Sequence, residues 1–329
     1  METTWSPNEG RNVTSNSTAD TIENEQESPT LYIFVTIFNT LTVLLIFLLN
    51  PLMLFTLRRV TSVQTTTKIF MASLTLSDLL NGAFWILRIV EITAGSWLLG
   101  DFLCAASDVC TILFDGLSIL SLLLLTMDRY IAISRPLRYL SMMSVFRSKL
   151  IVCSTWAVSI LFCILIYGIH AYSIIVQNGL SRVCLGGKYD WRVFLTITVI
   201  IISLATIFIL YAHITIIARN QARRIAAENQ AGNGQGGQRI NTRSTTTIII
   251  ITGTLIITWI PSVIRLAIVS QNQWGTSNKY LAFMLTQALV LSNGWMNVII
   301  YYLRNKDLRM ALRSLLSNWH HTLVQRFLP

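Results

Sequence analysis

Charged side chains are scarce in this chain of 329 residues. Asp, Glu, Lys and Arg make up only 12% of it, whereas 53% of the residues are hydrophobic. A soluble domain carries roughly 25% charged residues, because water must solvate its surface. The scarcity excludes a water-soluble protein, and the long apolar runs between short polar connectors indicate that lipid surrounds most of the chain.

Residues that carry out chemistry are also few. The chain has 4 histidines, of which two are isolated and two are adjacent near the C-terminus, so no metal-ligand spacing is present. No combination of nucleophile, base and orienting group is visible either, and an enzyme is therefore not expected. Internal duplication, which many transporters show, is absent as well. A transporter or channel remains a distant alternative.

Seven apolar segments are each long enough to cross a bilayer, which takes about 20 residues. They lie at roughly 31–57, 69–92, 102–134, 150–174, 191–218, 246–270 and 280–303. We therefore expect an all-α protein in which a seven-transmembrane helix bundle spans residues 31–303. An N-terminal tail, residues 1–30, precedes the bundle, and residues 304–329 form a cytoplasmic helix and tail.

Between Arg304 and Leu316, apolar residues recur at helical spacing with basic residues between them. The apolar positions are Leu308, Ala311, Leu312, Leu315 and Leu316. This pattern predicts a short amphipathic helix that lies on the membrane surface and contacts lipid. The Gly-rich stretch at 231–238, by contrast, predicts a flexible linker between the fifth and sixth spans.

The basic residues are distributed unevenly along the chain. Of the 25 Lys and Arg residues, 18 fall in alternate connectors and in the C-terminal tail, which places those segments in the cytoplasm. This segregation argues against a nucleic-acid-binding protein, which is the other usual interpretation of a basic chain. Residues 1–30 hold six acids and one base, and they contain glycosylation triplets at Asn12 and Asn16. We expect a multi-pass plasma-membrane protein with an extracellular, glycosylated N-terminus.

Two of the five cysteines lie where a disulfide can form. Cys110, Cys153 and Cys163 fall inside predicted spans. Cys104 lies at the outer start of the third span, and Cys184 lies in the second outer connector. Both face the oxidising side of the membrane, so a Cys104–Cys184 disulfide is predicted, with two free thiols as the alternative.

The most specific motif, Asp128-Arg129-Tyr130, ends the third span. Arg129 follows Cys104 by 25 residues. At 1.5 Å per residue this is roughly 37 Å, about one membrane with its interfaces, so the two residues lie at opposite ends of one helix. Further short motifs and single residues of note lie in the other spans and connectors. In chain order these are Asn50, Leu76-Ser77-Asp78-Leu79-Leu80, Trp97, Gly100, Ile131-Ala132-Ile133, Pro136-Leu137, Trp156, Tyr211, Trp259-Ile260-Pro261, Asn293 and Asn297-Val298-Ile299-Ile300-Tyr301.

This set resembles the class A (rhodopsin-like) G-protein-coupled receptors, loosely the amine receptors, across all seven spans. The resemblance implies a receptor that transmits an extracellular small-molecule signal to a cytoplasmic heterotrimeric G protein. Ser203 and Val298 replace prolines that the family usually has in the fifth and seventh spans, so the kinks and the energetics of activation are expected to depart from the family pattern. A retinal-binding opsin is excluded, because the nearby lysine, Lys279, lies at the outer edge of the seventh span.

The resemblance implies roles for two groups of residues. Those that contact the G protein or switch with activation are Asp128, Arg129, Tyr130, Leu137, Tyr211, Asn297 and Tyr301, with the helix ends around Arg219–Arg224 and Arg243. Those that hold a sodium ion are Asp78, Ser118, Asn293 and Asn297. Oxygen ligands with one carboxylate suit a hard monovalent cation. A water-filled polar cluster is the alternative, and no other cofactor is expected.

The aspartate that binds the ligand in amine receptors is missing, since its position is Thr111. Asp115 lies four residues further, one turn deeper on the same face, and is predicted to pair with a small cationic ligand such as a biogenic or trace amine. The other predicted ligand contacts are Asp108, Thr111, Trp259, Arg265 and Gln287, with Arg88 and Glu91 lining an outer vestibule. Two alternatives stay open. In the first, Asp115 is protonated or bonded to a neighbouring helix and binds no ligand. In the second, the arginines bind an acidic or peptide ligand.

Overall fold

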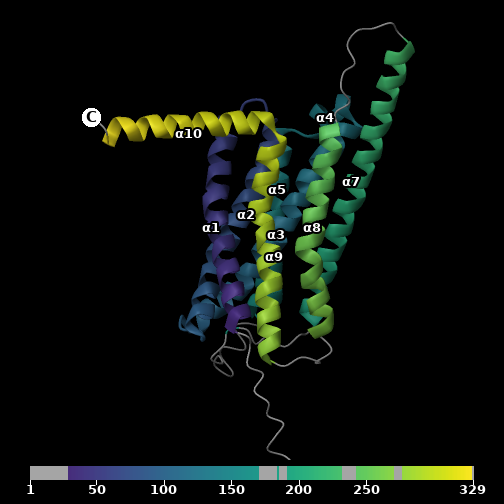
Figure 1. Cartoon of the computed structure of the whole chain (residues 1–329). Helices are drawn as coiled ribbons and strands as arrows, with labels where there is room; N and C mark the ends of the chain where they lie inside the picture. The colour runs from purple at the N-terminus through teal and green to yellow at the C-terminus, as the bar shows by residue number, and fades with distance from the viewer. Residues whose placement is uncertain (1–28, 170–183, 185–190, 232–241, 270–275, 328–329) are drawn as a thin grey trace, which may run out of the picture.

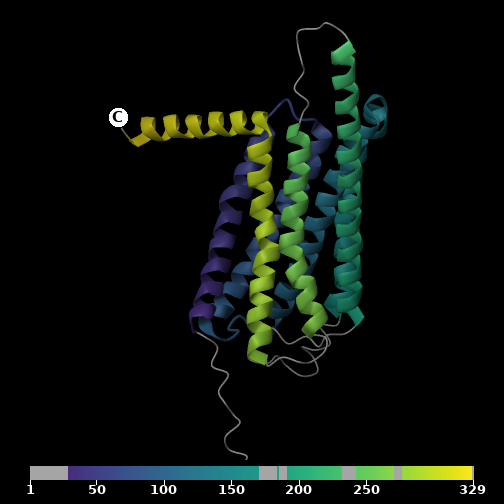
Figure 2. The same ribbon diagram turned by 45° about the vertical axis from the view of Figure 1, so that its right-hand side comes forward.

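The computed structural model describes residues 29–169, 184, 191–231, 242–269 and 276–327. The predicted glycosylation sites, Asn12 and Asn16, and most of the Gly-rich linker lie outside these ranges. Within them, seven long helices run alongside one another, and a further helix crosses one end of the bundle (Figure 1 and Figure 2). The predicted all-α helix bundle is confirmed.

The bundle helices coincide with the seven predicted spans. They are α1 (Pro29–Arg59), α2 (Thr65–Ala94), α3 (Gly100–Ser134), α5 (Val145–Cys163) with its π-helical continuation η1 (Ile164–Gly168), α7 (Trp191–Ala231), α8 (Thr242–Val269) and α9 (Thr276–Arg304). The short helix α4 (Pro136–Met142) connects α3 to α5, and α10 (Lys306–Phe327) follows α9.

The outer surface of the bundle is apolar. Six of the described helices are long and apolar enough to cross a membrane, and α8 contains a shorter apolar stretch, Gly253–Arg265. Large side chains such as those of Val158, Phe208 and Ile257 are more than half exposed. In water such a surface promotes association, whereas in lipid it needs no cover. The chain is therefore a multi-pass membrane protein.

Two helices extend further than the sequence predicted. α7 continues to Ala231 instead of ending near residue 218, and α10 reaches Phe327 instead of Leu316. Neither extension contains glycine or proline, so no residue type that breaks a helix ends them earlier. The short helix α4 was not predicted. It begins at Pro136, a residue that suits the first turn because the N–H groups there have no partner within the helix.

Asn305 forms the corner between α9 and α10. Its side-chain Oδ1 accepts hydrogen bonds from the backbone N–H groups of Asp307 at 2.9 Å and Leu308 at 3.3 Å, which is the geometry of a helix N-cap. Leu308 and Leu315 are buried, and Asp307 accepts a hydrogen bond of 2.7 Å from the Ser62 hydroxyl. These contacts hold α10 across the end of the bundle (Figure 1).

α3 packs against α2, α5 and α7 and runs the length of the bundle. We name the two ends of the bundle after the α3 residues that lie there, the Cys104 end and the Arg129 end; α10 lies at the Arg129 end. An apolar core occupies each half. The core nearer Arg129 includes Leu122 and Ile207, and the other includes Trp85 and Met284. α2 and α3 also carry buried polar side chains along their length, and these form the sites described below.

Candidate functional site

The predicted disulfide between Cys104 and Cys184 is present. The two Cα atoms are 5.6 Å apart, and both residues are buried. Cys110, Cys153 and Cys163 are free thiols. The disulfide therefore ties residue 184, from the connector that precedes α7, to the first turns of α3.

A buried ion network lies beside the disulfide. The guanidinium of Arg88 donates to Glu91, one turn further along α2, at 3.0 Å, and also to the carboxylate of Asp108 on α3. Glu91 in turn accepts a hydrogen bond of 2.7 Å from the backbone N–H of Cys184. The Arg88 guanidinium also lies 5.6 Å from the centre of the Trp97 ring, within reach of a cation–π interaction.

This network corrects the predicted vestibule. Arg88 and Glu91 were expected to line it, yet they are only 1% and 2% exposed. A charged pair that is removed from water is stable only when each partner is well satisfied. Here Arg88 and Glu91 pair with each other. Arg88 also pairs with Asp108, and Glu91 also accepts a hydrogen bond from the Cys184 backbone. Asp108 shares the Arg88 guanidinium with Glu91 and keeps 45% of its side chain exposed, so solvent also balances its charge. Neither Arg88 nor Asp108 therefore offers an unmatched charge to a ligand.

Asp115 follows Asp108 by seven residues on α3, which puts it about two turns further from the Cys104 end, and it has different partners. Its Oδ1 accepts a hydrogen bond of 2.6 Å from the side-chain amide of Asn81 on α2, and its Oδ2 accepts one from the amide of Gln287 on α9. Asp115 is partly exposed. In the part of the chain that the structure describes, no lysine, arginine or histidine forms an ion pair with it. The sequence alternative that Asp115 is bonded to neighbouring helices is thus realised, but only by neutral donors.

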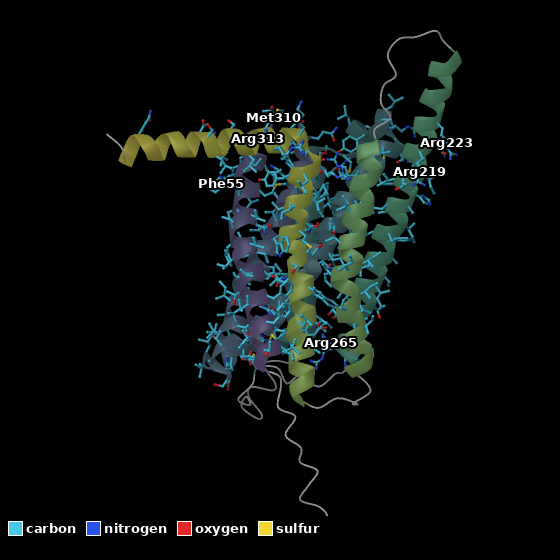
Figure 3. The ribbon with its side chains drawn as sticks, viewed as in Figure 1. Phe55, Arg219, Arg223, Arg265, Met310 and Arg313 are labelled. Carbon is cyan, nitrogen blue, oxygen red and sulfur yellow. A yellow bond between two sulfur atoms is a disulfide. The ribbon has the colours of Figure 1, made fainter. Side chains whose placement is uncertain are left out.

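The other predicted ligand residues have contacts of their own. The Thr111 hydroxyl donates to the backbone of Ser107 at 2.7 Å, and Trp259 is 4% exposed within the apolar core. Arg265 lies at the end of the bundle opposite α10 (Figure 3). Its Nε donates to Thr286 at 2.9 Å, and its guanidinium lies 5.1 Å from the centre of the Phe283 ring.

The four predicted sodium ligands include a buried carboxylate with one bonded and one open oxygen. Asp78 Oδ1 accepts a hydrogen bond of 2.6 Å from Ser118. Asp78 Oδ2, Asn293 Oδ1 and Asn297 Nδ2 have no hydrogen-bond partner in the described part of the protein. A Cβ on Gly294 would lie 3.1 Å from that of Asp78, so glycine lets α9 approach closely. Buried open oxygens beside a carboxylate fit a hard cation.

At the other end of α3, Asp128 is fully buried and holds Arg129 through a shared neighbour. Asp128 accepts hydrogen bonds from the hydroxyls of Tyr139 at 2.6 Å and Thr67 at 2.7 Å. Arg129 Nη2 lies 3.7 Å from Asp128 Oδ2 and donates to the Thr67 hydroxyl. Burial, followed by the hydrogen bond to Asp128, raises the pKa of Tyr139, so its phenol keeps the proton that it donates.

The remaining predicted coupling residues surround Arg129. Leu137 on α4 is 98% exposed, and the Tyr130 ring contacts His213 of α7 at 6.4 Å between ring centres. Tyr211 is buried, and the hydroxyl of Tyr301 has no hydrogen-bond partner among the described residues. Arg219 and Arg223 are exposed on the extension of α7 (Figure 3). The surface at the Arg129 end thus includes the exposed leucines Leu137 and Leu140 of α4 and several cations.

Comparison with known proteins decides the family. The family described as 7 transmembrane receptor (rhodopsin family) matches residues 49–301. The chain belongs to this family. The predicted class A resemblance is confirmed, and the protein is a receptor, not an enzyme.

Several characterised receptors are similar to this one over most of its length. Trace amine-associated receptor 13c of Danio rerio is 25% identical over 276 residues, 77% of this chain and 76% of that protein. Trace amine-associated receptor 8c of Rattus norvegicus is 23% identical over 286 residues, 82% of this chain and 81% of that protein. Melanocortin receptor 5 of Rattus norvegicus is 28% identical over 204 residues, 60% of this chain and 56% of that protein.

Sequence reasoning missed three residues that complete the receptor's polar sites. Asn81 holds Asp115, and Thr67 and Tyr139 hold Asp128. Asn81 lies three residues after Asp78, so helical periodicity alone puts both on one face of α2. Thr67 and Tyr139 carried no comparable signal, because their contacts cross from α2 and α4 to α3.

The Arg88 network generates a stability prediction. Arg88→Met leaves the buried Glu91 without its cation, and we expect a loss of about 3–5 kcal/mol of stability, the usual effect of breaking a buried ion pair. The double variant Arg88→Met/Glu91→Gln should regain much of that loss, because no uncompensated charge stays buried. Thermal unfolding of the purified receptor measures both, with Arg138→Met at an exposed arginine as control. A double variant no more stable than Arg88→Met would contradict this account.

Proposed function

We propose that this receptor binds a small cationic ligand, such as a biogenic or trace amine, at Asp115. The contrast between Asp108 and Asp115, two acidic residues on the outer half of α3, supports this. Asp108 is paired with Arg88, whereas Asp115 has only amide partners in the described part of the receptor. A carboxylate with neutral partners in a low-dielectric bundle gains most from a cation that a ligand brings. The names of the trace amine-associated relatives agree with that ligand class.

The proposed orientation follows from charge. The connectors at the Arg129 end, together with the C-terminal tail, carry 18 of the 25 Lys and Arg residues, so the Arg129 end faces the cytoplasm and the Cys104 end faces the outside. In this orientation the ligand reaches Asp115 from outside. The disulfide lies on the oxidising side, where such bonds persist.

Ligand binding is tested by neutralising Asp115. We expect Asp115→Asn to weaken activation by an amine by at least about 30-fold, equivalent to about 2 kcal/mol, because the ammonium loses its charged partner. Concentration–response curves for a panel of amines, peptides and carboxylates on wild type and variant measure this. Asp108→Asn is the matched control and should shift the same curves little. An anionic activator, or a cationic one that is indifferent to Asp115→Asn, would place the ligand chemistry elsewhere.

The receptor passes its signal, in this proposal, to a heterotrimeric G protein at the Arg129 end. Arg129 is 43% exposed and is held by Thr67 and Asp128, so a partner that binds it must compete with these two contacts. Release of Arg129 is therefore coupled to partner binding. Exposed Leu137, Arg219 and Arg223 lie on the surface that such a partner meets.

Thr67 provides a sharp test of this coupling. Thr67→Val keeps the side-chain shape but removes the hydroxyl that joins Asp128 to Arg129. We expect basal nucleotide exchange on the G protein to rise about fivefold, because the contacts that hold Arg129 in the resting receptor lose about 1 kcal/mol. Thr65→Val, at an exposed threonine of the same helix, is the control. Arg129→Ala should abolish exchange at normal surface expression; exchange that survives it would rule out Arg129 as the G-protein contact.

Sodium is the proposed modulator of this receptor. Asp78, Ser118, Asn293 and Asn297 would hold the ion, whose charge would balance the Asp78 carboxylate. A ligand that favours a state without the ion must expel it, so each weakens the binding of the other.

This linkage predicts a sodium effect on agonist binding. Replacing choline chloride with sodium chloride at constant ionic strength should lower agonist affinity by about fivefold or more in wild type. Radioligand competition measures the effect, and Asp78→Asn should remove it. If wild type binds agonist equally well in both salts, sodium is not a modulator.

A further inference from the structure

Two carboxylates lie in adjacent layers between α2 and α3. The lower layer pairs Asp78 of α2 with Ser118 of α3 at 2.6 Å, and the upper layer pairs Asn81 of α2 with Asp115 of α3 at 2.6 Å. Asn81 follows Asp78 by three residues, and Asp115 precedes Ser118 by three. Three residues of an α-helix span about 4.5 Å along the helix axis. The two layers are therefore stacked along the helices, with the layer of Asp115 nearer the Cys104 end, and their carboxylates lie on opposite helices. We call these four residues the two-layer site.

The two-layer site holds two carboxyl groups whose hydrogen-bond partners are all neutral. Asp78 is bonded to a hydroxyl and Asp115 to two amides, and no described lysine, arginine or histidine forms an ion pair with either. The layers are about 4.5 Å apart along the helices, so the two carboxyl groups would repel one another when both are ionised. Inside a bundle such charges need compensation of equal size. One sodium ion supplies half of it.

Three side chains in or next to the two-layer site carry oxygen atoms without a partner: Asp78 and Asn81 belong to it, and Asn293 precedes Gly294, whose backbone lies close to Asp78. Asp78 Oδ2, Asn81 Oδ1 and Asn293 Oδ1 have no hydrogen-bond partner in the described part of the receptor. Their residues are 4%, 4% and 2% exposed, so none of them is solvated from outside the protein. Buried oxygens without donors are costly unless a cation or a donor meets them.

This donor set has the composition of a calcium site. Ca²⁺ takes carboxylate and amide oxygens in flexible geometry, whereas Mg²⁺ requires a near-ideal octahedron and keeps several waters. Two oxygens on opposite sides of Ca²⁺ are about 5 Å apart, which compares well with the rise of about 4.5 Å between the layers. The amide of Gln287, which now donates to Asp115, presents an oxygen instead when it rotates by half a turn.

We propose that the two-layer site binds one divalent cation, Ca²⁺ in preference to Mg²⁺, between Asp78 and Asp115. The ligands are these two carboxylates with the amide oxygens of Asn81 and Asn293. The ion neutralises both charges at once, which sodium at Asp78 does not. An ammonium ligand at Asp115 and the divalent ion then exclude one another. The proposal stands independently of the ligand class, since it needs only the two carboxylates and the open oxygens.

The test uses purified full-length receptor in lipid nanodiscs without any amine. CaCl₂, MgCl₂ and NaCl are titrated at constant ionic strength while Tm is measured. We expect Ca²⁺ to raise Tm beyond the largest effect of Na⁺, with half-saturation at about 0.1–1 mM, and Mg²⁺ to act more weakly. Asp115→Asn should raise the Ca²⁺ concentration at half-saturation roughly tenfold or more while the Na⁺ response stays. Asp101→Asn, in the first turn of α3, is the control and should leave both responses unchanged.

Three outcomes would overturn the proposal. The first is that Na⁺ at saturation raises Tm as much as Ca²⁺ does. The second is that the Ca²⁺ response is unchanged in Asp115→Asn. The third is that neither ion changes Tm. Calorimetric titration of Ca²⁺ into wild-type receptor removes any dependence on the folding of the variant, with one ion per receptor expected and no binding as the contrary result. Because amines are absent, failure here leaves the proposed amine function untouched, and failure of the Asp115→Asn activation test leaves the calcium proposal untouched.

Discussion

Charges inside a helix bundle surrounded by lipid must be matched, because no bulk water is present to solvate them. This constraint accounts for the polar architecture of the receptor. Arg88 is almost completely buried and satisfies Glu91 and Asp108, while Asp128 is satisfied by two hydroxyls and by Arg129. At Asp78 and Asp115 the described protein supplies neutral donors alone, and we propose that a cation from outside meets the same constraint there.

α3 arranges these groups along a single axis. Asp108 lies beside the disulfide, Asp115 and Ser118 lie in the two-layer site, and Asp128 ends the helix next to Arg129. The order along α3 places the proposed ligand and ion sites between the outer ion network and the proposed coupling surface.

α7 and α9 have Ser203 and Val298 at the two positions where the family usually has proline. Ser203 in α7 keeps its backbone N–H, and its hydroxyl bonds to the carbonyl of Val199 at 2.8 Å, while Val298 is 2% exposed within α9. Both helices are continuous across these positions, whereas α1 and α8 contain Pro51 and Pro261. Kinks that depend on a lost backbone hydrogen bond are therefore available in α1 and α8 but have no such cause at Ser203 or Val298.

The seven spans, the helix that follows them, the cysteine pair and the burial of Asp78 could all be predicted from the sequence, whereas the burial of Glu91 could not. Lipid imposes length and hydropathy on each segment separately, so these features are local. The partner of each acid was decided only in the folded bundle. Arg88 forms an ion pair with Asp108 and not with Asp115, and the Thr67 hydroxyl bonds both Asp128 and Arg129. These pairings follow from the rotation of each helix about its axis and from its position along the bundle. A shift of one residue turns a side chain by about 100° and raises it by 1.5 Å, enough to exchange one partner for another, and no local pattern records that choice.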